Sequence, residues 1–91
     1  MSAAVRDNTA RSRFELEADG VLVFMNYRRD GNVISLDHTE TPVAARGRGL
    51  ASQLAAGVLE AVRARGLKIV PRCPFVRAYV EHHPQYRDLM A

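Results

Sequence analysis

A short loop rich in arginine and glycine offers the clearest chemistry in this sequence. The loop is Arg46-Gly47-Arg48-Gly49, and it runs directly into a segment with helical periodicity. The first N–H groups of a helix have no partner within the helix, and the helix dipole is positive there. Glycine lets an anion approach the backbone, and arginine adds charged donors. This pattern indicates a site for phosphate or pyrophosphate, although such a loop could also simply turn a strand into a helix.

Four side chains elsewhere could act as an acid, a base or a nucleophile: His38, Glu40, Cys73 and Tyr79. His38 and Glu40 lie two residues apart in a predicted strand and therefore share a face. Cys73 follows a strand that we expect beside the strand of His38, so the imidazole and the thiol could face each other. Such a thiol could be a nucleophile or a proton donor. Equally, Cys73 could be a small buried residue of the core.

The composition narrows the class of protein. The chain has 91 residues, 47% of them hydrophobic, which predicts one folded domain. A single cysteine excludes an internal disulfide and favours a reducing compartment. We expect a cytoplasmic protein without a membrane partner, because no apolar run is long enough to span a bilayer and residues 1 to 13 do not resemble a signal peptide. The net charge of +3 is small and spread along the chain, so no nucleic-acid partner is expected.

The elements that must position these residues follow from periodicity. Alternating residues predict strands over 13–18, 21–29 and 33–40, with turns at Asp19-Gly20 and at residues 30–32. Spacings of three and four predict a helix over about 47–65, and Gly66 is well placed to end it; the apolar stripe is Leu50, Leu54, Val58 and Val62.

The second half of the chain completes an α/β fold with a mixed sheet. We expect a short strand over 67–70, a helix over about 74–82 and a last helical turn over 85–91. The strands around the long helix form a crossover and should be parallel, which places a ligand near their carboxyl ends. The predicted order is β-β-β-α-β-α, with a flexible N-terminal segment over 1–12 and a single domain over 13–91.

Several motifs together resemble one known family. Residues 46–51, RGRGLA, fit the pattern R/Q-x-x-G-x-G/A of the acetyl-coenzyme A loop in the GCN5-related N-acetyltransferases. The resemblance extends over about residues 13–88 and is strongest to the small YjdJ-type members. The other motifs that carry it are residues 37–42, residues 69–75, and Tyr79 with residues 83–86. It implies a minimal acyl-CoA N-acyltransferase-like fold and transfer of an acetyl group from acetyl-CoA to an amine.

The resemblance also implies roles for individual residues. The pantetheine arm would lie between the two parallel strands, against the main chain around Glu40 to Val43. The cofactor-binding residues implied in this way are Thr41, Pro42, Val43, Arg46, Gly47, Arg48, Gly49, Leu50 and Ala51. Small members of the family are thought to use the histidine and cysteine corresponding to His38 and Cys73, and larger members place a tyrosine that protonates the coenzyme A sulfur where Tyr79 stands.

Other interpretations of these residues remain open at this point. Tyr79 could be an aromatic that packs the last helix, Glu40 a solvated carboxylate, and His38 a strand histidine bonded to the backbone. The histidines and Cys73 fit no zinc spacing, so no metal is expected. Compared with larger members of the superfamily, the sequence lacks the N-terminal helices that usually wall the acceptor site. We therefore expect this site to be open or completed by another chain. The acceptor is an unidentified amine of a small molecule or a peptide. The alternative function is a coenzyme A-binding or interaction module with little turnover.

Overall fold

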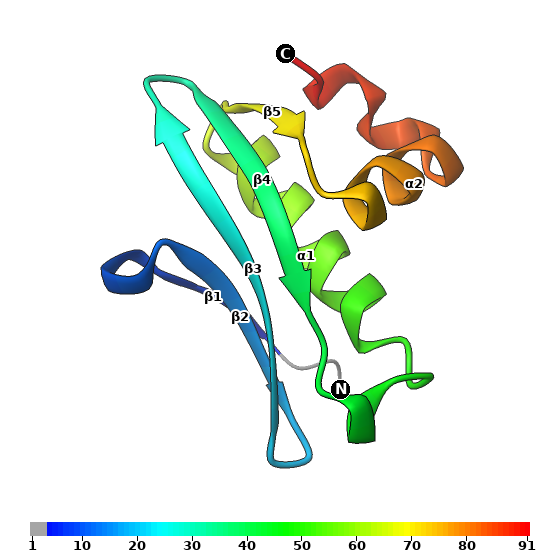
Figure 1. Ribbon diagram of the computed structural model, residues 1–91. Coiled ribbons are helices and arrows are strands. Elements are labelled where there is room, and N and C mark those ends of the chain that lie inside the picture. The colour runs from blue at the N-terminus through cyan, green and yellow to red at the C-terminus, as the bar shows by residue number, and fades with distance from the viewer. Residues whose placement is uncertain (1–3) are drawn as a thin grey trace.

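The computed structural model describes residues 4–91 and shows a five-stranded sheet with two α-helices (Figure 1). The strands are β1 (Val5–Asn8), β2 (Arg13–Ala18), β3 (Val21–Asp30), β4 (Val33–Glu40) and β5 (Lys68–Pro71). They lie in chain order, antiparallel except for the parallel pair β4–β5. The helices are α1 (Leu50–Ala64) and α2 (Pro74–His82), with short 3-10 turns η1 (Thr9–Arg11), η2 (Val43–Ala45) and η3 (Pro84–Leu89). The predicted mixed α/β fold and its parallel crossover are confirmed.

The N-terminal segment corrects the prediction. Residues 1–12 were expected to be flexible, but residues 5–8 form β1, which pairs antiparallel with β2, and η1 follows. Residues 1–3 lie outside the described part of the chain. β1 also lies close to the middle of α1, because a side chain at Gly57 would overlap Val5. The polar composition of this segment did not indicate a strand, because β1 is stabilised by its pairing with β2 and not by its own residue preferences.

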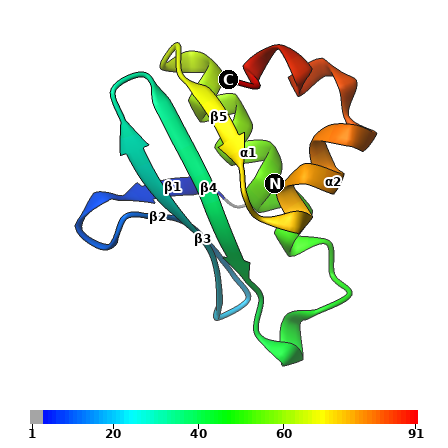
Figure 2. The same cartoon turned by 45° about the horizontal axis from the view of Figure 1, so that its top comes forward.

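Helix α1 covers one face of the sheet and builds the core with it. It lies behind β4 in Figure 1 and behind β5 in Figure 2, while α2 lies on the far side of β5 from β4. Its buried residues are Leu50, Leu54, Ala55, Val58, Leu59 and Val62. They meet buried side chains of the strands, namely Phe14, Leu16, Val23, Met25, Ile34, Leu36 and Ile69. We call the opposite side of the sheet, which no helix of the described chain covers in these views, the outer face.

The ends of α1 follow from glycine conformation. The helix begins at Leu50 rather than at 47, because Gly47 and Gly49 adopt positive φ angles of 85° and 73°. It ends at Ala64, and Gly66 has a φ of 69°, as its position predicted. The N–H of Leu67 bonds to the carbonyl of Val62 at 3.0 Å, which closes a Schellman motif and turns the chain into β5.

A bulge in β4 decides which way its last residues point. Asn26 and Tyr27, which are consecutive on β3, pair with His38 and Leu36, so Asp37 is an extra residue on β4. Beyond the bulge, Thr39 pairs with the fully buried Met25 and faces α1. Its neighbours in the strand, His38 and Glu40, therefore lie on the outer face.

The two parallel strands separate after a short stretch. Their pairing runs from Val33–Lys68 to Leu36–Pro71, and the N–H of Cys73 bonds to the carbonyl of Leu36 at 2.9 Å. β4 continues to Glu40 beyond the last pair. Among the described residues, the end of β4 is therefore flanked by β3 on one side and has no paired strand on the other.

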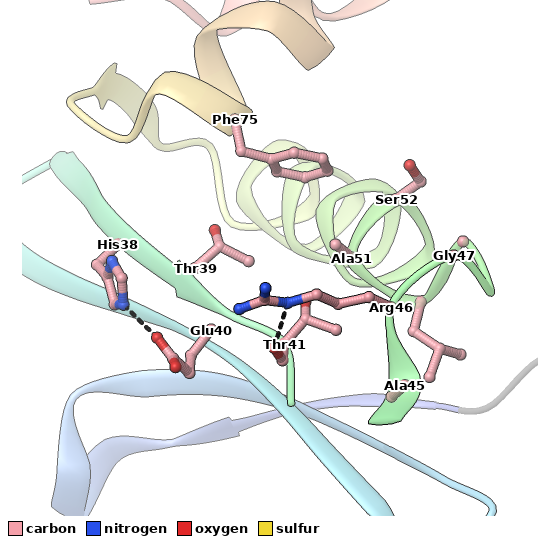
Figure 3. Close-up of a pocket in the computed structure, with 12 residues that line it drawn as sticks. His38, Thr39, Glu40, Thr41, Ala45, Arg46, Gly47, Ala51, Ser52 and Phe75 are labelled. Carbon is pink, nitrogen blue, oxygen red and sulfur yellow. Dashed lines mark hydrogen bonds and ion pairs between the residues drawn. The ribbon is translucent and has the colours of Figure 1, made fainter. Parts of the chain in front are cut away.

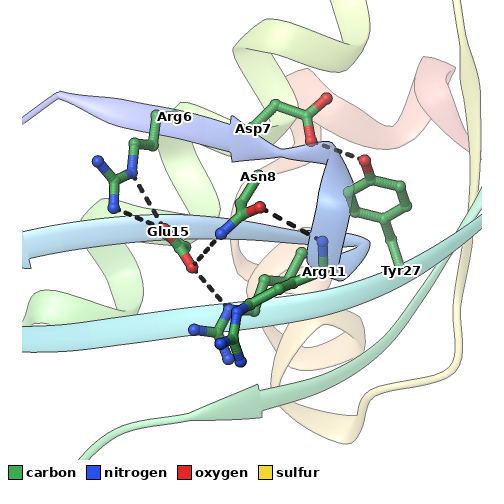
Figure 4. A network of polar contacts seen from close by, with 7 residues as sticks. Arg6, Asp7, Asn8, Arg11, Glu15 and Tyr27 are labelled. Atoms are coloured by element: carbon green, nitrogen blue, oxygen red, sulfur yellow. Dashed lines mark hydrogen bonds and ion pairs between the residues drawn. The ribbon is translucent and has the colours of Figure 1, made fainter.

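One carboxylate is buried on the outer face. Glu15 is only 2% exposed, and its oxygens accept hydrogen bonds from Arg13 Nε at 2.7 Å, Asn8 Nδ2 at 2.9 Å and Arg6 Nη2 at 2.8 Å (Figure 4). The bonds from Arg13 and then Asn8 outweigh the cost of burial and lower the pKa of Glu15 to about 2. This network ties β1 to β2.

Since the pKa of Glu15 is depressed in the folded state, its contribution to stability is complete above the ordinary value of 4.5 and is lost as pH falls towards 2. We expect the midpoint of thermal unfolding to fall less steeply between pH 5 and pH 2 in Glu15→Gln than in the wild type. Glu17→Gln, an exposed neighbour on the same strand, is the control and should keep the wild-type profile. An equally steep fall in Glu15→Gln would contradict this account.

None of the helices in residues 4–91 is long and apolar enough to cross a bilayer.

Candidate functional site

A cleft of about 490 Å³ lies between the end of β4 and the start of α1 (Figure 3). This is the position at which the sequence analysis expects a ligand, namely the carboxyl end of the strand that precedes the glycine loop. Its lining consists of His38, Thr39, Glu40, Thr41, Ala45, Arg46, Gly47, Gly49, Leu50, Ala51, Ser52 and Phe75. The cleft thus joins β4, the loop, the first turn of α1 and α2.

Within the described residues, the start of α1 has no side-chain cap. Gly49 is the N-cap, no side chain caps the helix, and its first turn holds no acidic residue. The first helical bond runs from the N–H of Gln53 to the carbonyl of Gly49 at 3.0 Å, so the preceding amides have no helical acceptor. Because Gly49 and Leu50 line the cleft, the positive end of the helix dipole lies at its wall.

The two loop arginines differ in position. The side chain of Arg46 lies across the cleft, and its Nε donates to the carbonyl oxygen of Thr41 at 3.3 Å (Figure 3). Arg48 does not line the cleft; its Nη1 lies 3.9 Å from a carboxylate oxygen of Asp19 in the turn between β2 and β3. Both guanidinium groups are therefore held only weakly, and both remain partly exposed.

His38 and Glu40 form a pair at the edge of the cleft. Nε2 of His38 lies 2.7 Å from Oε2 of Glu40, and the side chains are 60% and 49% exposed. The close-up shows both on the side of β4 away from α1 (Figure 3). An imidazole and a carboxylate in hydrogen-bond contact and open to solvent can accept a proton from an incoming group.

Cys73 is buried, which agrees with one of the two interpretations that the sequence left open. Its side chain is 4% exposed, and Sγ lies 3.5 Å from Oγ1 of Thr39. The expectation that His38 could face Cys73 is wrong, because the bulge at Asp37 turns His38 to the outer face and brings Thr39 to the thiol. The thiol does not line the cleft, although its partner Thr39 does.

Tyr79 belongs to an aromatic stack on α2 and η3. Its ring is stacked on His83 with centroids 3.9 Å apart, and it lies 6.3 Å from Phe75. Burial, followed by the charge of Glu60, raises the pKa of Tyr79, so the phenol stays protonated at neutral pH. Tyr79 does not line the cleft, but Phe75, one helical turn before it, does.

Sequence reasoning missed four of the lining residues: Thr39, Ala45, Ser52 and Phe75. The resemblance had pointed at Pro42 and Val43, which do not line the cleft, and the side chain of Val43 is 77% exposed. Ser52 could have been predicted as a lining residue, because it is a polar residue in the first turn of the helix and therefore lies close to the loop amides. Thr39 could not, because only the bulge sets its direction.

Comparison with known proteins agrees with this geometry. A model of the family described as GCN5-related N-acetyl-transferase matches residues 13–89. The protein NATD1 of Gallus gallus and that of Mus musculus are each 40% identical over 52 residues, which cover 57% of this chain and 47% of the relative. The matched segment thus spans about half the length of these curated relatives.

A solved structure resembles the whole chain. The NMR solution structure of a GCN5-like protein from Staphylococcus aureus superimposes with a TM-score of 0.68 at 26% identity, covering 99% of this chain and 89% of the other. The family match over residues 13–89 includes every residue that lines the cleft. The chain therefore belongs to the GCN5-related N-acetyltransferase family.

Proposed function

We propose that this protein transfers the acetyl group of acetyl-CoA to an amine. The observation that carries the proposal is the uncapped N-terminus of α1, with two glycines at positive φ, at the wall of a cleft beside the end of β4. Family membership supports the reaction class. The acetyl-CoA dependence and the roles of individual residues are inferences from this geometry.

The residues present fit a diphosphate and its pantetheine arm. The amides of residues 47–51 would hold the pyrophosphate, with Arg46 and Arg48 adding charge. The end of β4, from Thr39 to Thr41, has no paired strand on the β5 side and lines the cleft, so it offers main-chain groups to an extended amide chain. When bound, acetyl-CoA supplies a thioester, which is an activated acyl group with a thiolate leaving group.

The chain's own contribution to the chemistry is proton transfer. We assign the role of base to the pair His38 and Glu40, because both residues border the cleft and their side chains are in contact with each other at its edge. The pair would accept a proton from the ammonium group of the acceptor, and the free amine would attack the carbonyl carbon. A C–N bond forms and the C–S bond breaks, and the second proton that the nitrogen loses as it becomes an amide balances the proton that the thiolate takes up to become the thiol.

The position of Cys73 favours direct transfer over an acetyl-cysteine intermediate. A nucleophilic thiol must be reached by the thioester, but this one is buried against Thr39. We therefore assign Cys73 to the support of Thr39 in the cleft wall. Tyr79 is protonated but does not line the cleft. It remains our candidate for the proton donor to the sulfur, a role that requires the cleft to rearrange.

Coenzyme A binding tests the helix start directly. We expect wild-type protein to bind coenzyme A in a calorimetric titration, and Gly49→Ala to bind at least about tenfold more weakly, because a Cβ strains the positive φ on which the exposed amides depend. Gly31→Ala is the matched control: Gly31 also has a positive φ, of 60°, but lies in the turn between β3 and β4. No heat of binding by the wild type at millimolar coenzyme A would refute the proposal.

Substitution of the paired base separates an enzyme from a binding module. With a generic amine acceptor, His38→Ala and Glu40→Gln should each lower kcat by about 100-fold, the usual range for loss of a general base, with coenzyme A affinity unchanged. His82→Ala, which removes an exposed histidine from the end of α2, should behave as wild type. Turnover that is indifferent to both substitutions would leave the coenzyme A-binding module as the better description.

The route of transfer can be read from the mass of the protein. After mixing with acetyl-CoA in the absence of acceptor, we expect no added acetyl group on Cys73, and we expect Cys73→Ser to retain kcat within about fivefold if the protein transfers directly. An acetyl adduct that forms and decays at the rate of turnover, and that Cys73→Ser abolishes, would establish the two-step route instead.

A further inference from the structure

A second large hollow lies between the end of β5, α2 and η3. It has a volume of about 450 Å³, close to that of the cleft, and it shares no lining residue with the cleft. Its lining consists of Pro71, Arg77, Val80, Glu81, Arg87 and Met90. A hollow of this volume with an apolar floor and a few polar groups is typical of a site for a small molecule.

The return of the chain to the sheet creates this hollow. After α2, η3 turns back towards β5 (Figures 1 and 2). Met90 forms a parallel bridge with Ile69, and the N–H of Ala91 donates to the carbonyl of Ile69 at 2.9 Å. The end of the chain is therefore attached to β5, and the hollow is bordered by all three elements.

The floor of the hollow is apolar. Val80 is 4% exposed and belongs to the core, whereas Met90 is one of two large hydrophobic side chains in the described chain that are exposed. Tyr86 and Leu89 of η3 are buried, while Arg87 and Met90, which are three residues apart, lie on the other side of this turn and line the hollow. The structure thus leaves a methionine facing a hollow and not the core.

The rim of the hollow carries an excess of positive charge. Arg77 and Glu81 are one turn apart on α2, and Arg87 lies on η3. Within the described residues, none of these three groups forms an ion pair within 4.0 Å. Asp88, which follows Arg87, is engaged elsewhere because both its oxygens accept hydrogen bonds from Arg63. Two guanidinium groups therefore face one carboxylate, which leaves one net positive charge.

The backbone of β5 offers little to a further strand at this place. The carbonyl of Ile69 already accepts a hydrogen bond from Ala91, and Pro71 has no N–H to donate. Addition of a peptide strand needs a row of unpaired donors and acceptors along an edge. The side chains of the hollow, and not its main chain, therefore decide what it binds.

We infer that this hollow binds a small monocarboxylate with an apolar body of about eight carbons. Its carboxylate lies between Arg77 and Arg87, because guanidinium groups bind carboxylates through paired hydrogen bonds and the rim has one positive charge to spare. Its apolar body packs on Val80 and on Met90, whose flexible thioether chain adapts to the shape of a ligand. No residue of the proposed acetyl-transfer site takes part, so this inference does not rest on the proposed function.

The test uses octanoate as the probe and octylammonium as its counterpart of opposite charge. Amide chemical shifts of the full chain are followed by NMR while each compound is added to the wild type, to R77Q/R87Q, to Met90→Ser and to the control R11Q/R29Q. The control removes the same charge from two exposed arginines that do not line this hollow.

We expect octanoate to shift amides of residues 77–81 and 87–90 saturably, with a Kd of about one millimolar or below. R77Q/R87Q should weaken binding about three- to tenfold, since exposed ion pairs contribute modestly, and high salt should weaken it in the wild type. Met90→Ser should also weaken binding, and R11Q/R29Q should behave as the wild type. Octylammonium should bind more weakly than octanoate.

The inference is overturned by the absence of saturable shifts, by equal binding of octylammonium, by R77Q/R87Q binding octanoate as the wild type does, or by shifts centred on residues 46–51. Shifts of residues 77–90 that depend on protein concentration without octanoate would assign the hollow to contact between copies and would overturn it too. A protein that binds coenzyme A but not octanoate keeps the proposed function and loses this site. A protein that binds octanoate but not coenzyme A has the opposite meaning.

Discussion

The structure depends on the point at which β5 stops pairing with β4. Up to Leu36 the two strands are joined by parallel hydrogen bonds; beyond it, in the described part of the chain, β4 continues to Glu40 paired only with β3. Because the crossover helix α1 links these strands, its N-terminus must begin near the unpaired end of β4. The main chain of the strand and the free amides of the helix therefore border one cleft, and this arrangement accommodates a long ligand with a charged diphosphate.

The bulge at Asp37 gives the cleft two chemically distinct sides. On the α1 side, Thr39 contacts the buried thiol of Cys73 and joins an apolar wall with Leu50 and Phe75. On the outer face, His38 and Glu40 pair with each other in contact with solvent. A single extra residue thus separates the side of β4 that carries Thr39 from the side that carries the proposed base.

Within residues 4–91, the outer face is stabilised by charge pairing rather than by a covering helix. On this face Glu15 lies beneath Arg6, Arg13 and Asn8, and on the α1 face Tyr27 donates to Asp7 at 2.7 Å. These contacts attach β1 to the sheet and satisfy the buried carboxylate without a second apolar layer.

The sequence by itself determined the periodic elements and the loop: the stripe of α1, its end at Gly66 and the glycines before Leu50 follow from local rules of helix geometry. The family was predicted from the loop at residues 46–51 and from the other motifs that resemble it. Only the tertiary structure decided that residues 5–8 form a strand, that Thr39 rather than His38 meets Cys73, and that Phe75 lines the cleft while Tyr79 does not. These facts depend on strand pairing, on a register shift and on the approach of α2, which arise from contacts distant in the chain that no local pattern encodes.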